Sequence, residues 1–261
     1  MLTGALMPEI GIAQSVGHDL ETAGKDMLHI WSAPSRFKAS ALPEIGFVFG
    51  GTGALLLIDE WFYKWLSTHR RSLPGAALGV FTEDKPLNLL GRSFVLVPTS
   101  LLLYGVGWAA DRPDLRHAGL GCISSNLATT LSRSLLNRVI DRFRPRYQKG
   151  AFEIAVRPII GSTWETRSFP GGHAANIMAC VSFWNNRFDL GVAEPALYAV
   201  ALGVGWARVL DGAHWPSDTF FAEAYGWTVG RAVAHRYRER LPDRATVPGG
   251  GGFEVGLRFS F

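Results

Sequence analysis

Charged residues are scarce in this 261-residue sequence, at 18% against about 25% in an average soluble domain. The chain is nevertheless 48% hydrophobic, which excludes an intrinsically disordered protein. It has only two cysteines, too few for the disulfide framework of a small secreted protein. Because Cys122 and Cys180 both lie in apolar stretches, we expect them to be buried free thiols.

Lysine is also rare, with five residues among the 26 that are basic, so arginine carries most of the positive charge. The formal net charge is +4, and we expect no nucleic-acid partner. The planar guanidinium group of arginine suits phosphate and carboxylate groups. The number of arginines indicates no function by itself, but the positions of some of them do.

No apolar run clearly reaches the about 20 residues that a transmembrane helix needs. The run at residues 45–58 is short, the run at 94–110 contains Pro98, and the run at 190–207 contains Glu194. These runs therefore fit two alternatives, helices within a membrane and buried helices of a soluble core.

Hydrophobic periodicity predicts an all-α fold of about six core helices after an amphipathic N-terminal helix. The expected helices cover residues 14–33, 45–72, 94–110, 117–142, 172–186, 195–209 and 216–238. Between them, residues 150–169 contain Pro158 and Gly161 and are expected to form an irregular connection, without a sheet.

The C-terminal tail has a different pattern. After four glycines, hydrophobic residues occupy every second position from Phe253 to Phe261, which is the period of a strand. We therefore expect three regions: a helical segment at residues 1–40, the main helical domain at 41–240, and a glycine-rich linker with a strand-like tail at 241–261.

Three short segments carry phosphate-binding or acid–base chemistry at expected helix ends. The first is Arg142-Phe143-Arg144-Pro145-Arg146, which would close the helix at 117–142 and gather guanidinium groups there. Alone, this segment also fits simple capping, because cations are favoured near the last carbonyl groups of a helix.

The second segment is Ser-Phe-Pro-Gly-Gly-His at residues 168–173, just before an expected helix. Gly171 and Gly172 let backbone N–H groups approach a ligand closely, and the N-terminus of a helix attracts anions. His173 would lie in the first helical turn, where its imidazole can transfer protons near neutral pH. Alone, the segment also fits an ordinary turn.

The third segment runs from Arg208 to Asp218, with Arg208 at the end of one helix and Pro216 at the start of the next. His214 and Asp218 are four residues apart and would face each other across one helical turn. A carboxylate bonded to one imidazole nitrogen fixes the tautomer and makes the other nitrogen more nucleophilic. The alternative is a capping pair at the surface.

His173, His214 and Asp218 would also form a set of two histidines and one carboxylate, of the kind that binds a metal ion. Arg144 and Arg208 argue against this alternative, because they would repel a cation and attract an anion. We therefore expect no metal and no cofactor.

In this order and at this spacing, the three segments resemble the motifs of the type 2 phosphatidic acid phosphatase (PAP2) and vanadium haloperoxidase superfamily. Those motifs are Lys-x6-Arg-Pro, then Pro-Ser-Gly-His, then Ser-Arg-x5-His-x3-Asp. The resemblance covers about residues 90–238 and implies a PAP2-like helical bundle. The matching residues are Arg144, Pro145, Pro170, Gly172, His173, Arg208, His214 and Asp218.

Three positions depart from these motifs. Asn137 stands where the lysine is expected, Gly171 replaces the serine of the second motif, and Ala207 replaces the serine of the third. The missing lysine removes a cation from the expected phosphate pocket. Arg133 lies three helical turns before Arg144, and Arg138 is one step from the lysine position. We expect Arg133 or Arg138 to supply the missing charge.

The resemblance implies a metal-independent phosphatase for a phosphomonoester or diphosphate. His214 would attack phosphorus and become phosphohistidine, Asp218 would orient it, and His173 would protonate the leaving oxygen and then activate water. The groups expected to hold the phosphoryl oxygens are Arg144, Arg208 and the backbone N–H groups at Gly171 and Gly172.

Two alternatives stay open. One is a haloperoxidase that binds vanadate in the same pocket, which we rank lower because the missing lysine leaves the expected pocket short of cations. The other is a decayed site that only binds an anion or a lipid. The expected partner is a phosphorylated lipid or a small phosphoester. We favour a protein of the bacterial cell envelope, membrane-associated or periplasmic, with its site facing the periplasm.

Overall fold

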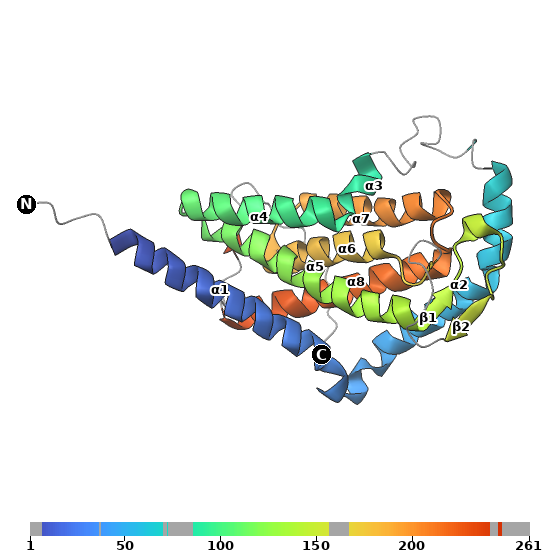
Figure 1. Ribbon diagram of the computed structural model, residues 1–261, viewed down its shortest axis with the longest axis horizontal. Helices are drawn as coiled ribbons and strands as arrows, with labels where there is room; N and C mark the ends of the chain where they lie inside the picture. Colours follow the sequence, from blue (N-terminus) through green and yellow to red (C-terminus); the bar gives the residue numbers. More distant parts are fainter. Residues whose placement is uncertain are drawn as a thin grey trace, which may run out of the picture.

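The computed structural model describes residues 7–36, 38–69, 72, 86–156, 167–240 and 245–246. These residues form eight α-helices and a few short strands, so the predicted helical fold is confirmed (Figure 1). The helices are α1 Met7–Trp31, α2 Leu42–His69, α3 Pro86–Leu90, α4 Ser93–Ala109, α5 Pro113–Val139, α6 Gly172–Arg187, α7 Ala193–Leu210 and α8 Pro216–Arg240. The strand-like tail from Phe253 to Phe261 and its glycine linker lie outside the described residues, and the three-region division stays a prediction.

Helix α6 lies at the centre of the bundle, with twelve of its sixteen residues buried. It packs against α8, α5 and α7, while α4 packs along α5. Glycines on α8 permit a close approach between the backbones of α8 and α6. A Cβ on Gly226 or Gly230 would lie 2.3 Å from the carbonyl oxygen of Ala175 or Ala179. Because only glycine fits there, the backbones of α6 and α8 lie in direct contact along their length.

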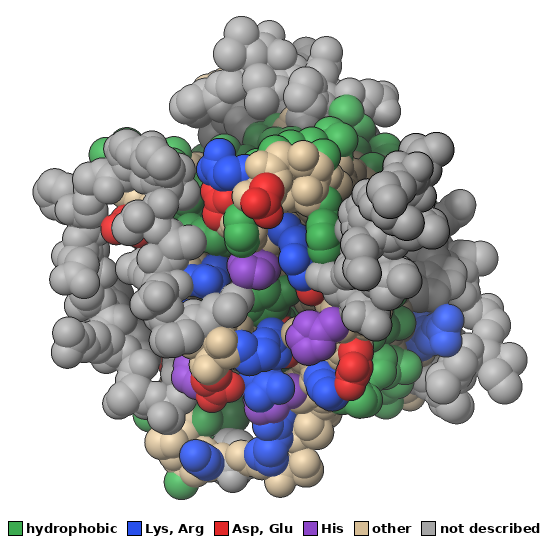
Figure 2. Space-filling view, turned by 90° about the vertical axis from the view of Figure 1, so that its left-hand side faces the viewer, with side chains coloured by type: hydrophobic (Ala, Val, Ile, Leu, Met, Phe, Trp, Pro, Cys, Tyr) green, Lys and Arg blue, Asp and Glu red, His purple; other side chains and the backbone are tan. Residues whose placement is uncertain are grey.

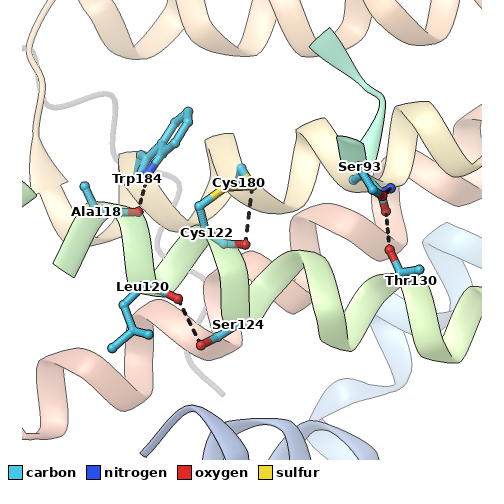
Figure 3. Close-up of a disulfide and its surroundings, with 9 residues drawn as sticks. Ser93, Ala118, Leu120, Cys122, Ser124, Thr130, Cys180 and Trp184 are labelled. Carbon is cyan, nitrogen blue, oxygen red and sulfur yellow. Dashed lines mark hydrogen bonds between the residues drawn. A yellow bond between two sulfur atoms is a disulfide. The ribbon is translucent and has the colours of Figure 1, made fainter. Parts of the chain in front are cut away.

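A disulfide joins α5 to α6 and corrects the prediction of free thiols (Figure 3). Cys122 and Cys180 are both fully buried, and their Cα atoms are 4.5 Å apart. Nearby, the indole N–H of Trp184 donates to the carbonyl oxygen of Ala118 at 3.0 Å. The apolar stretches around both cysteines indicated burial, but they do not tell which helices cross or where, so the pairing was missed.

The segment after α5 corrects a second prediction, because the helix ends at Val139 instead of continuing to Arg142. Strand β1, Ile140–Arg142, pairs antiparallel with β2, Ile154–Val156. Backbone hydrogen bonds between β1 and β2 replace the hydrogen bonds of the helix here. Pro145, which has no backbone N–H, prevents the chain from returning to an α-helix. The expectation of no sheet in this region was therefore wrong. Arg142 and Arg144 lie on extended chain.

Short elements complete the fold. They are the 3-10 helices η1 Ala33–Arg36, η2 Ala39–Ala41 and η4 Pro145–Tyr147, and the strands β3 Phe188–Asp189 and β4 Ala245–Thr246, which pair in parallel. An isolated bridge between Phe143 and Arg167 extends the pairing of β1 toward the start of α6. This bridge brings the first and second sequence segments side by side.

Helix α1 lies across the bundle with Met27 and Ile30 packed against the core and other apolar residues outward. Leu20 and Leu28 are 65% and 66% exposed, whereas Asp19 and Asp26 are buried. The two carboxylates accept hydrogen bonds from arginines of α5 and α8. The amphipathic N-terminal helix is therefore present, but ion pairs as well as apolar contacts hold it to the bundle.

Helix α2 combines an exposed apolar part with a docked part. Within the described ranges, one helix, Ala39–His69, is long and apolar enough to cross a membrane, and none of its most apolar 18-residue window is buried. Further along, Asp59 and Leu66 are buried, and Leu66 packs against Val209 and Leu210 at the end of α7. Helix α2 thus reaches the end of the bundle near β1 (Figure 1).

Candidate active site

A cavity of about 390 Å³ lies where α5 ends and where α4 and α6 begin. It gathers most of the predicted site residues. Those that line it are Arg133, Asn137, Arg144, Gly172, His173, Arg208 and His214. Arg138 and Asp218 do not line it, and Gly171 lies just behind, next to the His214 ring. The three sequence segments therefore meet at one end of the bundle.

Five arginines line this cavity, which overturns the argument that it is short of cations. Arg92 and Arg167 join the motif residues Arg144 and Arg208 and the expected replacement Arg133. Among the described residues that line the cavity, none is Asp or Glu. Arg92 is the N-cap residue of α4, and Arg167 directly precedes the second segment. Only Arg167 had a signal in the sequence, its position next to Ser168.

His214 is held in one tautomer. Its Nδ1 lies 2.6 Å from the backbone carbonyl oxygen of Ser168. Because a carbonyl can only accept, Nδ1 carries the proton and Nε2 keeps its lone pair. Burial, followed by Arg208 and Arg144, keeps the pKa of His214 well below 6.5, so the ring is neutral. A neutral ring with a free Nε2 lone pair is a nucleophile.

Asp218 does not touch the His214 ring, which corrects the predicted contact. Helix α8 begins at Pro216, so His214 lies outside the helix and the four-residue spacing is not one helical turn. Asp218 instead accepts hydrogen bonds from the Ser168 hydroxyl, an Arg142 N–H and, at 3.0 Å, the Trp215 backbone N–H. Burial raises its pKa, although Arg142 opposes the effect. Asp218 is linked to the His214 ring through Ser168, whose hydroxyl donates to Asp218 and whose carbonyl oxygen accepts from the ring.

His173 lies in the first turn of α6 and faces the cavity. Burial, followed by repulsion from Arg208, Arg92, Arg133 and Arg144, lowers its pKa from 6.5 to about 3. Its Nε2 is buried and has no hydrogen-bond partner among the described residues. An unprotonated, unpartnered ring nitrogen beside several arginines can take up a proton once an anion neutralises them.

Arg133 and Arg138 differ in their placement. The Arg133 guanidinium packs against Gly172, where a Cβ would lie 3.0 Å from its central carbon atom, and it lines the cavity. Arg138 is exposed. Asn137, in the lysine position, donates to the Phe169 carbonyl oxygen at 2.8 Å and so holds the second segment in place. Of the two arginines, only Arg133 is placed to replace the missing lysine.

A buried charge network behind the cavity was not predicted. Arg142, which is only 2% exposed, binds Asp218 on α8 and Asp59 on α2. The guanidinium carbon of Arg142 lies over the Trp215 ring, 5.3 Å from the ring centroid. Arg142 belongs to the arginine-rich first segment, but nothing in the sequence links it to α2. In the described parts of the chain, no group of three or more His, Cys, Asp or Glu residues could hold a metal ion.

Comparison with known proteins places this site in a family context. Residues 115–242 match the PAP2 superfamily. The chain is 30% identical over 147 residues to the lipid A 1-phosphatase of Rhizobium etli, covering 52% of this chain and 62% of that protein. It is 31% identical over 172 residues to the lipid A 1-phosphatase of Rhizobium johnstonii, covering 58% and 68%. No solved structure matches this chain.

Proposed function

Because this chain belongs to the PAP2 superfamily, we propose that it is a metal-independent phosphatase that acts on a phosphorylated lipid. The observation that supports this most is the pairing of two neutral histidines with five arginines around one cavity. Histidines supply the nucleophile and the proton carrier, and arginines balance a phosphoryl group. The site residues below are assigned on this basis.

The first step uses His214 as the nucleophile. Its Nε2 lone pair attacks phosphorus, the bond to the leaving oxygen breaks, and the phosphoryl group is carried on His214. The Nδ1–H bond to Ser168 stabilises the positive charge that develops on the ring. Arg144 and Arg208, with the backbone N–H groups at the start of α6, stabilise the phosphoryl oxygens.

His173 transfers the protons. In the free protein it is neutral, because its pKa is about 3. A bound phosphate offsets the arginine charges that repel a proton, so the pKa of His173 rises and the substrate monoanion can share its proton with Nε2. His173 then protonates the leaving oxygen. In the second step it takes a proton from water, whose oxygen attacks phosphohistidine and regenerates His214.

The lipid substrate and the membrane location are supported by surface and compartment features. The apolar part of Ala39–His69 is unburied and could cross a bilayer, and it precedes the part that packs on the end of α7. The Cys122–Cys180 disulfide fits an oxidising compartment such as the periplasm. Both curated relatives are named lipid A 1-phosphatases. We therefore propose a cell-envelope enzyme whose site faces the periplasm, with lipid A as the first substrate to test.

A vanadate-dependent haloperoxidase is the second candidate, because five arginines would also balance vanadate. Bromide oxidation with vanadate and peroxide, in the absence of phosphatase turnover, would support it. A protein that only binds an anion would show neither activity, although it would retain affinity for inorganic phosphate.

The proposed function is tested by phosphate release from lipid A in mixed micelles, with a short-chain phosphomonoester in parallel. His214→Ala is expected to reduce turnover at least about 1,000-fold, because no other group can replace the nucleophile. His235→Ala is the matched control, since His235 is exposed on α8 at the other end of the bundle. Turnover of His214→Ala at the wild-type rate would rule out this mechanism.

A further inference from the structure

We propose that Asp59 is a positioning residue that makes α2 part of the active site, an inference that rests on the proposed function. Asp59 lies on α2 and is fully buried. Residues 115–242, which match the family, do not include it. None of the three sequence segments pointed to α2, so its contribution appears only in the folded chain.

Asp59 fixes the start of α8. One carboxylate oxygen accepts the Ser217 backbone N–H at 3.0 Å, and the other accepts the Ser217 hydroxyl. Backbone N–H groups in the first helical turn have no partner within the helix, so a side chain must cap them. Here the cap comes from another helix. Asp218 caps Trp215 in the same turn, at 3.0 Å. Two carboxylates thus hold the residues that directly follow His214.

Asp59 also fixes Arg142. It accepts an Arg142 N–H at 2.7 Å, and the other arm of the same guanidinium binds Asp218. Two of the remaining Arg142 donors bind the Ala151 carbonyl oxygen at 2.9 and 3.0 Å, and one binds the Ser217 hydroxyl oxygen at 2.9 Å. With every arm engaged, the guanidinium cannot rotate, and it holds Asp218 in place. Removal of Asp59 would release one arm and the Ser217 cap together.

The contacts continue to the nucleophile. Asp218 accepts the Ser168 hydroxyl, and the Ser168 carbonyl oxygen accepts Nδ1–H of His214 at 2.6 Å. A chain of hydrogen bonds therefore runs from α2 through Arg142, Asp218 and Ser168 to the imidazole that we assign as the nucleophile. Asp59 itself does not line the cavity. It is expected to affect the attack by His214 rather than the binding of substrate.

The unburied apolar window of α2 lies before Asp59, where Phe47 contacts Phe220 of α8, and after Asp59 the side chain of Leu66 packs on the end of α7. A change in the position of α2 in a bilayer would therefore alter the hydrogen bonds between Asp59 and Ser217. The geometry makes the membrane-crossing helix a support of the catalytic histidine, in addition to an anchor.

The test compares Asp59→Asn with Asp26→Asn in the full-length protein. Asp26 is a matched control: it is also fully buried and bound by arginine, but it joins α1 to α8 far from the cavity. Asp59→Asn is expected to lower kcat about 10- to 100-fold with KM changed less than threefold. Asp26→Asn is expected to lower the melting temperature by a similar amount and to leave kcat within twofold. Equal losses of kcat in the two variants would overturn the proposal.

A second readout does not depend on turnover. The His214 Nδ1 proton, which is buried and strongly hydrogen-bonded, should give a downfield proton NMR signal that is absent in His214→Ala. Asp59→Asn should broaden or shift this signal, and Asp26→Asn should not. An unchanged signal in Asp59→Asn would overturn the inference even if the protein hydrolysed no substrate. Absence of wild-type turnover would instead contradict the proposed function alone.

If Asp59→Asn does not fold, Ser217→Ala removes only the hydroxyl contacts of Ser217 with Asp59 and Arg142. It is expected to lower kcat about threefold to tenfold at unchanged KM. A kcat equal to that of the wild type would contradict the positioning role.

Discussion

Two groups of arginines in this protein have opposite surroundings. In the first, which holds α1 to the bundle, Arg116 binds Asp19 at 2.7 Å and Arg240 binds Asp26 through two bonds of 2.8 Å. Seen from the end opposite the cavity, basic and acidic side chains lie next to one another (Figure 2).

The second group, around the cavity, has no carboxylate among the described lining residues. Two ion pairs of this group are longer than those of the first group, with Asp211 at 3.6 Å from Arg208 and Asp141 at 3.9 Å from Arg167. In the first group, a buried carboxylate balances each arginine charge, and these ion pairs help to hold α1 to the bundle. The described lining of the cavity contains five arginines and no Asp or Glu, a charge distribution that attracts an anion.

The largest difference between the two groups should follow from removing one arginine of each. Arg208→Ala is expected to lower kcat/KM for a phosphate ester about 100-fold, because a contact to the charged phosphoryl group is lost. Arg240→Ala leaves Asp26 short of partners and should lower the free energy of unfolding by about 3 kcal/mol, with kcat/KM unchanged. Steady-state kinetics and chemical denaturation measure both. A kinetic defect in Arg240→Ala that equals that of Arg208→Ala would remove the distinction.

The cavity should also make stability depend on pH. His173 has a folded pKa of about 3, below the ordinary 6.5, so the unfolded chain binds its proton more readily. The stability that neutral His173 contributes is complete above pH 6.5 and is lost as pH falls toward 3. At pH 5 the loss is about 2 kcal/mol.

The variant His173→Gln should therefore lose less stability than the wild type between pH 7 and pH 5, as measured by denaturation at each pH. His235→Gln, which changes an exposed histidine on α8, should keep the wild-type pH dependence. If the His173 variant is as sensitive to acid as the wild type, the cavity does not hold that imidazole neutral.

A smaller effect separates two neighbouring arginines on α5. Arg133 lines the cavity, whereas Arg138 is exposed and lies outside it. Arg133→Ala should lower kcat/KM about 10-fold, because one contact to a charged phosphoryl group is lost. Arg138→Ala should stay within twofold. The opposite ranking would mean that Arg138 supplies the charge that the motif lysine has elsewhere.

The smallest effect is expected where the motif serine is missing. A Cβ on Gly171 would lie 3.6 Å from the His214 ring and from Ala222, which is ordinary contact, so a serine fits. Gly171→Ser should fold normally and change kcat less than about threefold in either direction, since the backbone N–H is already present. A loss of more than 10-fold in phosphate release would show that the hydroxyl crowds His214.

Sequence reasoning predicted the helical fold and most of the groups at the cavity, because motif spacing and helix ends are local properties. It did not predict the disulfide or the roles of Arg92 and Asp59. These contacts depend on which helices cross and on where along each helix the crossing lies. It also placed Asp218 against His214, because a four-residue spacing was taken as helical although α8 begins only at Pro216. Register between elements, rather than residue type, was the missing information.

The central claim is that His214 carries the phosphoryl group during turnover. The most direct measurement is to mix the full-length protein with ³²P-labelled substrate, quench within milliseconds in alkali, and map the label by mass spectrometry. The account predicts a base-stable, acid-labile label on His214, which lasts longer in His173→Gln and is absent in His214→Ala. Continued turnover with no labelled histidine, or with the label on another residue, would contradict it.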